Sequence, residues 1–163
     1  MKKNVTKKRM MVIILLIAVL IVAAAAGIFI IGGKKQSGTG GMKIEKGAVE
    51  WNQDMKGSDE NAAIQIPYYS DIYMEKGSDE IDMYLVNPKE NECYFTYTFI
   101  LKEDSEEIYQ SGLIEPGKAL DKVTLSRKIE GGEYELDMRI DTYTLDKKEP
   151  LNNAIVSTKL IVK

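Results

Sequence analysis

The chain has 163 residues, of which 44% are hydrophobic and 29% charged, a composition that fits one folded domain with a short additional segment. Five basic residues precede the first apolar run, so the rest of the chain carries 17 basic residues against 25 acidic ones, a net charge of −8. Such an acidic surface repels phosphate backbones, and we expect no nucleic-acid partner.

Histidine is absent and Cys93 is the single cysteine. These counts exclude a disulfide within the chain, a zinc site of the usual type, and a Ser-His or Cys-His nucleophile. We therefore expect no metal and no cofactor. Free cysteine is among the most buried residue types, so we expect Cys93 to be a small core residue.

Residues 10–31 form a run of 22 residues without charge, amide or proline, which as a helix would reach about 33 Å. We interpret the run as a transmembrane signal-anchor helix that follows a basic cytoplasmic tail at residues 1–9. A signal peptide cleaved after Ala26 and a buried soluble helix are the alternatives. The residues after Ala26 remain apolar until Gly32, and this favours the uncleaved anchor.

More basic residues precede the apolar run than follow it closely, which favours a cytoplasmic N-terminus. We therefore expect a single-pass protein of the cell membrane whose C-terminal domain lies outside the cytoplasm. Residues 32–42 read as a flexible Gly-rich linker, and residues 43–163 as the extracytoplasmic domain.

The domain shows hydrophobic residues with a period of two, which is typical of half-buried strands. The clearest alternation covers three segments: residues 81–85, 93–101 and 134–140. Five shorter segments are also predicted strands: residues 63–66, 72–74, 108–111, 123–126 and 155–162. No segment after residue 42 has the pattern of a long helix.

Polar and Gly- or Pro-containing segments separate these strands. Residues 102–107, KEDSEE, read as a hairpin loop, and their acidic side chains lack the spacing of a calcium loop. Pro116 followed by Gly117 is the order that a type II turn prefers. The pentapeptide KGSDE occurs at 56–60 and 76–80 without similar flanks, so we interpret both copies as polar turns leading into strands.

About seven short strands in this length predict an all-β, antiparallel β-sandwich. Residues 130–136, EGGEYEL, resemble the signature of the tyrosine corner in immunoglobulin-like domains, with Leu136 at the position of the disulfide cysteine. Because Leu136 replaces that cysteine and no partner cysteine occurs on an earlier strand, the chain resembles disulfide-free sandwiches such as fibronectin-III-like or bacterial surface domains. The resemblance also implies structural roles for Gly132 and for Tyr134, whose hydroxyl group would bond to the backbone across the corner; Pro116 and Gly117 are structural as turn residues.

Most of residues 64–163 is similar to small membrane-anchored extracytoplasmic proteins of Gram-positive bacteria. This resemblance rests on YLVNPKENECYFTYTFIL, IYQSGLIEPGKALDKVTL and IEGGEYELDMRI. It implies a location and a fold.

Two classes of function remain: an interaction or assembly module and an enzyme. An enzyme would need carboxylate pairs such as Asp137 and Asp141, but i and i+4 on a strand lie about 13 Å apart, too far for paired acid and base catalysis. We therefore predict a non-enzymatic module that binds a protein or a cell-wall component. A proteinase-inhibitor-like sandwich and, less favoured, a carboxylate-based hydrolase are the alternatives. The predicted binding surface is one face of a strand, formed by Tyr94, Thr96, Thr98 and Ile100.

Overall fold

The computed structural model describes residues 42–53 and 62–163. The predicted cytoplasmic tail, the predicted transmembrane helix, nearly all of the linker and the first KGSDE copy lie outside these residues. Ten strands form the described part: β1 Val49–Glu50, β2 Ile72–Met74, β3 Glu80–Ile81, β4 Leu85–Asn87, β5 Cys93–Leu101, β6 Glu106–Gln110, β7 Lys118–Leu120, β8 Val123–Thr124, β9 Gly132–Thr144 and β10 Pro150–Val162.

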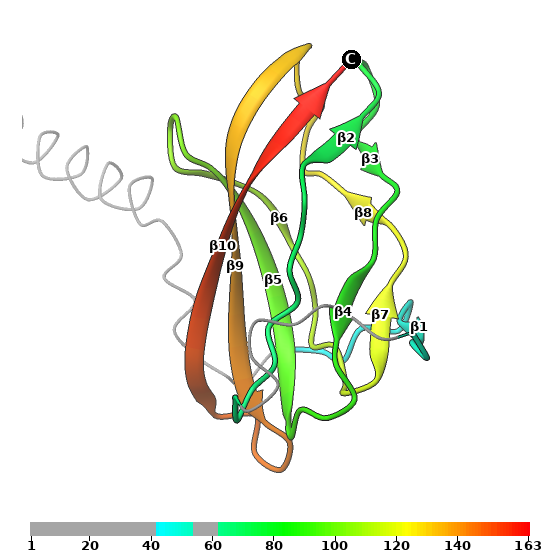
Figure 1. Ribbon diagram of the computed structural model, residues 1–163, viewed down its shortest axis with the longest axis vertical. Helices are drawn as coiled ribbons and strands as arrows, with labels where there is room; N and C mark the ends of the chain where they lie inside the picture. Colours follow the sequence, from blue (N-terminus) through cyan, green and yellow to red (C-terminus); the bar gives the residue numbers. More distant parts are fainter. Residues whose placement is uncertain (1–41, 54–61) are drawn as a thin grey trace, which may run out of the picture. The chain divides into compact units, whose positions relative to one another are not determined.

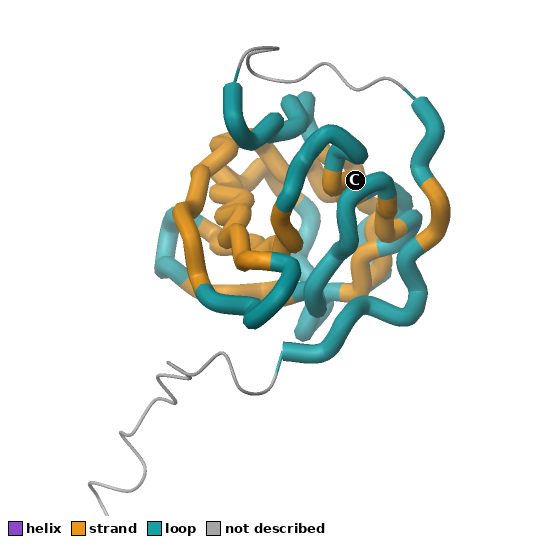
Figure 2. The backbone as a smooth tube through the Cα atoms, turned by 90° about the horizontal axis from the view of Figure 1, so that it is seen from below, coloured by secondary structure: helices purple, strands orange, loops and turns teal. Residues whose placement is uncertain are grey.

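The strands form three sheets, and the described residues contain no helix (Figures 1 and 2). The largest sheet has five strands in the order β2-β10-β9-β5-β6. A three-stranded sheet, β1-β7-β4, and a two-stranded sheet, β3-β8, make up the rest. All neighbours pair antiparallel except β2 and β10, which are parallel, so the prediction of a purely antiparallel arrangement is wrong for this one pair.

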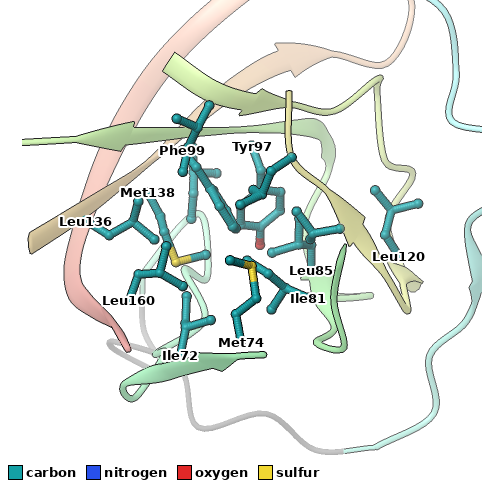
Figure 3. Packing of buried hydrophobic residues seen from close by; sticks show 14 of the residues in the cluster. Ile72, Met74, Ile81, Leu85, Tyr97, Phe99, Leu120, Leu136, Met138 and Leu160 are labelled. Carbon is teal, nitrogen blue, oxygen red and sulfur yellow. The ribbon is translucent and has the colours of Figure 1, made fainter. Parts of the chain in front are cut away.

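One hydrophobic core joins the sheets, as in a β-sandwich (Figure 3). Tyr97 and Phe99 of β5 and Met138 of β9 come from the five-stranded sheet and have no exposed surface. Leu85 of β4 and Ile81 of β3 come from the smaller sheets and meet them in the same cluster. Each apolar position of the alternating pattern thus contributes to one shared interior. The single cysteine, Cys93, is also buried in this core, as predicted.

The predicted strands at residues 72–74 and 93–101 have the bounds of β2 and β5. The predicted strand 81–85 is instead divided, because its first part pairs with β8 and its last part with β7, which belong to different sheets. The alternation continues across the break, since Ile81 and Leu85 are both buried. Residues 63–66 form no strand, and the number of strands is ten rather than about seven.

The turns follow the sequence signals closely. Gly117 has a φ of 73°, the left-handed value that the third position of a type II turn requires, and Lys118 N–H donates to the Glu115 carbonyl over 3.1 Å. The polar loop after Leu101 joins β5 to β6 as a hairpin, with Leu101 opposite Glu106. In the second KGSDE copy, Gly77 has a φ of 85° in the turn that leads to β3.

Candidate functional site

The four residues predicted as a binding surface do share one face of β5, but that face is largely covered. Thr96 and Thr98 have no exposed surface and Tyr94 is 8% exposed, while Ile100 is half-buried. The prediction of an open surface is therefore corrected for three of the four. The physical reason is the position of β5 between β9 and β6, inside the sheet, where neighbouring side chains reach over short threonines.

Arg139 of β9 lies directly opposite Thr98. Its Nη2 atom is 3.4 Å from Thr98 Oγ1 and 3.3 Å from Glu107 Oε1 of the loop-side end of β6, so the guanidinium extends across β5. At the other end of the strand, Tyr94 packs with Leu113, Tyr143 and Met42 in a small second cluster. The face is thus closed at both ends.

The segment at residues 43–45 contributes to this cover by pairing with Leu113. Glu45 N–H donates to the Leu113 carbonyl over 2.8 Å, and Leu113 N–H donates to the Lys43 carbonyl over 3.0 Å. Gly112 permits the approach, because a Cβ atom there would lie 2.8 Å from the Lys43 carbonyl oxygen. Residues 43–45 show no strand pattern in the sequence, and their pairing with Leu113 was not predicted.

The surface that β9 and β10 expose on the large sheet is mainly polar. Lys102 Nζ is 3.8 Å from Asp137 Oδ1, and Arg139 Nε is 3.0 Å from Asp141 Oδ2. Asp137 and Asp141 therefore have basic partners at the protein surface, where such ion pairs add little stability. In the sheet register Asp137 faces Ser157 and Asp141 faces Asn153, so neither has a carboxylate opposite it on β10. Within the described residues no group of three acidic or thiol side chains could hold a metal ion.

Two buried polar clusters were missed by the sequence reasoning. In the first, Asn87 Nδ2 donates to the carbonyls of Cys93 and Ile114 over 2.8 and 2.9 Å, and Asn91 Nδ2 donates to Asn87 Oδ1 over 3.0 Å. The Asn91 side-chain amide also donates from Nδ2 to the Gln65 carbonyl and accepts at Oδ1 from Gln65 N–H. These asparagines lie in residues 86–92, VNPKENE, one of the polar, proline-containing segments between predicted strands. They satisfy backbone groups where two loops meet in the interior.

The second cluster joins Tyr69 and Tyr97 to the backbone of Val86. Tyr97 Oη donates to the Val86 carbonyl over 2.6 Å, Val86 N–H donates to Tyr69 Oη over 3.1 Å, and the two hydroxyl oxygens are 3.0 Å apart. Burial raises the pKa of Tyr69 to about 12 and that of Tyr97 well above its usual value. Both hydroxyl groups therefore stay protonated at neutral pH. They bond to the N–H and carbonyl of Val86 in β4, on the side of the strand away from β7.

The corner before β9 contains the bond that the sequence motif suggests. Tyr134 Oη donates to the Glu130 carbonyl over 2.9 Å, and Leu136, two residues later, is fully buried in the core. Gly132 begins β9, where a Cβ atom would make ordinary contact with the ring of Tyr134. The hydrogen bond between Tyr134 and Glu130 thus fixes how the chain enters β9, the first strand of the β9–β10 hairpin.

The first half of β10 forms an open edge of the five-stranded sheet (Figure 1). β9 pairs with β10 along its length, but β2 pairs only with residues 160–162. Upstream of that pairing, Leu151 is 50% exposed and Ile155 is 59% exposed. We call residues 150–157 the β10 edge. Within residues 42–53 and 62–163 its outward backbone groups have no partner, and two of its apolar side chains are exposed.

Comparison of the chain with protein-family models, with curated proteins and with solved structures gave no match in any of the three. Among the described residues, no helix is both long enough and apolar enough to cross a membrane. The predicted span at residues 10–31 lies outside them. We therefore infer a function from the residues of the domain itself.

Proposed function

We propose that this protein is a non-enzymatic interaction or assembly module, tethered by residues 10–31 to the outer face of the cytoplasmic membrane. The β10 edge carries the proposal. Proteins usually protect an exposed strand edge with charges, proline or covering loops, because unpaired N–H and C=O groups recruit another strand. An edge left open with apolar side chains is the form that binding by strand addition requires.

We further propose that the domain is immunoglobulin-like. The hydrogen bond from Tyr134 to Glu130 supports this, because it is the bond that the tyrosine-corner resemblance implies. The burial of Leu136 supports it as well, since a core side chain then replaces the disulfide of other members. In such domains, binding usually involves loops or sheet edges, whereas the sandwich supplies a rigid support.

The tether gives the module its place of action. An uncharged run of 22 residues after a basic tail would hold the domain within a short linker of the bilayer. With a C-terminal tag on the full chain, we expect the protein in the membrane fraction with an intact N-terminus. External protease should remove the tag from cells without a wall. Release into the medium, or a tag that stays protected, would contradict this part of the proposal.

The binding surface can be tested by site-specific photo-crosslinking in intact cells. We would replace Ile155 of the full chain by p-benzoylphenylalanine and look for a discrete adduct after irradiation. The matched control places the same group at Val49, which is 41% exposed on the edge strand β1 of another sheet. An adduct at position 155 but not at 49 supports the proposal. Absence of an adduct at 155, or equal smears at both positions, would count against it.

A further inference from the structure

We propose that the β10 edge is occupied by the β10 edge of a second copy of this chain, paired antiparallel about a twofold axis at Ile155. This inference rests on the proposed function, since it names the partner of the same edge. It follows from the direction of the free backbone groups, the symmetry of the free stretch and the placement of charge.

The backbone groups of alternate β10 residues point away from β9. Lys163, the residue after β10, donates from its N–H to the Met74 carbonyl, and its carbonyl accepts from Lys76 N–H. The backbone groups of odd-numbered residues therefore point toward β2 and away from β9. Asn152, by contrast, exchanges hydrogen bonds with Thr142 Oγ1 of β9. Because the register is regular from Asn153 to Val162, the outward residues upstream of β2 include Asn153, Ile155 and Ser157. Their backbone groups have no partner on that side within residues 42–53 and 62–163.

The limits of the free stretch define its centre. The register of the β9–β10 pair shifts between Pro150 and Asn153, which ends the regular strand on one side. β2 occupies the edge from Leu160 onward, and Thr158 Oγ1 donates to the Ser70 carbonyl over 2.9 Å, so the free stretch ends at Ser157 on the other side. Between these limits the three outward residues are symmetric about Ile155. A twofold axis there pairs every one of them and would form about six backbone hydrogen bonds, two for each facing pair.

The side chains of this stretch are compatible with their own copy. Ile155 would face Ile155 of the second copy, a β-branched pair of the kind that stabilises neighbouring strands. Asn153 would face Ser157, and Ala154 would face Val156. Residues 150–158 contain no charged side chain, so no like charges meet across the contact.

Charge also favours this edge as the place where two acidic copies can meet. The acidic residues of the exposed sheet face that lie nearest to β10 are on β9, the neighbouring strand. In the paired arrangement the two β9 strands are separated by three strand spacings, about 14 Å. This exceeds the screening length of about 8 Å at physiological ionic strength, so repulsion between the two acidic rows is weak. Tethering to one membrane would further concentrate the copies.

Disulfide trapping tests the register with the full chain in a non-denaturing detergent. Facing residues with outward backbone groups have Cα atoms about 5.5 Å apart, within reach of a disulfide. We expect Ile155→Cys to form covalent dimers under mild oxidation. Asn153→Cys and Ser157→Cys should each stay monomeric alone, because the two copies of either residue lie about 13 Å apart, but they should crosslink when mixed. Wild-type protein is the background, since Cys93 is buried.

A second measurement covers the case in which a cysteine variant folds poorly. By light scattering in the same detergent, we expect the wild-type chain to dimerise and Ile155→Lys to weaken dimerisation at least about tenfold, because it places two like charges opposite each other. Val49→Lys, the control on β1, should dimerise like the wild type. Equal crosslinking at 153, 155 and 157, or a monomeric wild type, would overturn the second-copy assignment.

The photo-crosslink at position 155 separates failure of this inference from failure of the proposed function. An adduct of twice the chain's own mass supports the second copy. An adduct of another mass, together with a monomeric purified protein, overturns the second copy but leaves an interaction module with a different partner. No adduct and no dimer would overturn both proposals.

Discussion

Replacing Asn87 should destabilise the domain more than its small size suggests. Its amide donates to the carbonyls of Cys93 and Ile114 and accepts from Asn91, and the side chain has no exposed surface. Asn87→Leu removes all three bonds while keeping a similar volume. Leucine leaves no cavity in which a water molecule could replace the amide. The carbonyls of Cys93 and Ile114 and the Asn91 amide would therefore each lose one partner inside the protein.

The cost can be worked out group by group. The Ile114 carbonyl keeps a second donor, Phe95 N–H at 3.1 Å, and Asn91 keeps the Gln65 carbonyl, so these two losses cost about 1 kcal/mol each. The Cys93 carbonyl has no other partner on that side among the described residues. An orphaned buried carbonyl costs about 2 kcal/mol. The expected loss in the free energy of unfolding is therefore about 4 kcal/mol, a large part of the total for most domains.

Urea unfolding of the full chain in a non-denaturing detergent, followed by near-UV circular dichroism, measures this loss. The control is Asn152→Leu, at an exposed residue whose bonds to Thr142 come from the backbone, and we expect a change below about 0.5 kcal/mol. If Asn87→Leu costs less than about 1 kcal/mol, the amide does not support the two carbonyls as described.

Asn87→Asp removes the two hydrogen-bond donors of the amide while the side chain keeps its shape. The introduced carboxyl group is nearly isosteric, but its ionised form faces two carbonyl oxygens without a proton to donate. Burial and these carbonyls should raise its pKa in the folded state above the unfolded value of about 3.9. Stability contributed by the protonated form is then present below that pH and falls as pH rises. A variant that is as stable at pH 7 as at pH 4, relative to wild type, would refute this reasoning.

Three further predictions concern the corner, the tyrosine pair and the covered face. Tyr134→Phe should lower the free energy of unfolding by about 1 kcal/mol in urea, because only the bond to Glu130 is lost; a neutral result would show that the corner bond adds nothing. Since the pKa of Tyr69 is about 12 when folded and about 10 when unfolded, stability should fall above pH 10 by up to about 1.4 kcal/mol per pH unit, and Tyr69→Phe should reduce that slope. Gly112→Ala should displace residues 43–45 and speed hydrogen exchange at the Glu45 amide, whereas Gly47→Ala, with open space around its Cβ, should leave it unchanged.

Local sequence signals predicted much of the strand content. The alternation from Cys93 to Leu101 is long enough to fix both ends of β5, and Pro116-Gly117 identified a turn whose glycine has the required positive φ. Such features depend on neighbours along the chain, and those are visible in the sequence. The division between β3 and β4 was not predictable in this way, because it depends on β7 and β8, more than 30 residues away.

The candidate site shows the same limit more clearly. Alternation correctly placed Tyr94, Thr96, Thr98 and Ile100 on one face, but it cannot say what packs on that face. Cover by Arg139 and by residues 43–45 arises only from pairing between distant segments. Threonine is polar, which suggested that Thr96 and Thr98 would be exposed. Because threonine is also small, the longer side chains of neighbouring strands cover both residues.

The amino-acid sequence by itself determined the all-β character of the domain, its acidic charge, the burial of its single cysteine and the absence of histidine chemistry, because these follow from composition and from the period of two. The tertiary structure decided which strands are neighbours and hence which edge remains unpaired. Residues 150–157 are an unremarkable polar and apolar mixture when read as sequence. They become a candidate binding edge because β2 pairs only with residues 160–162 of β10, and the preceding outward backbone groups have no partner among the described residues.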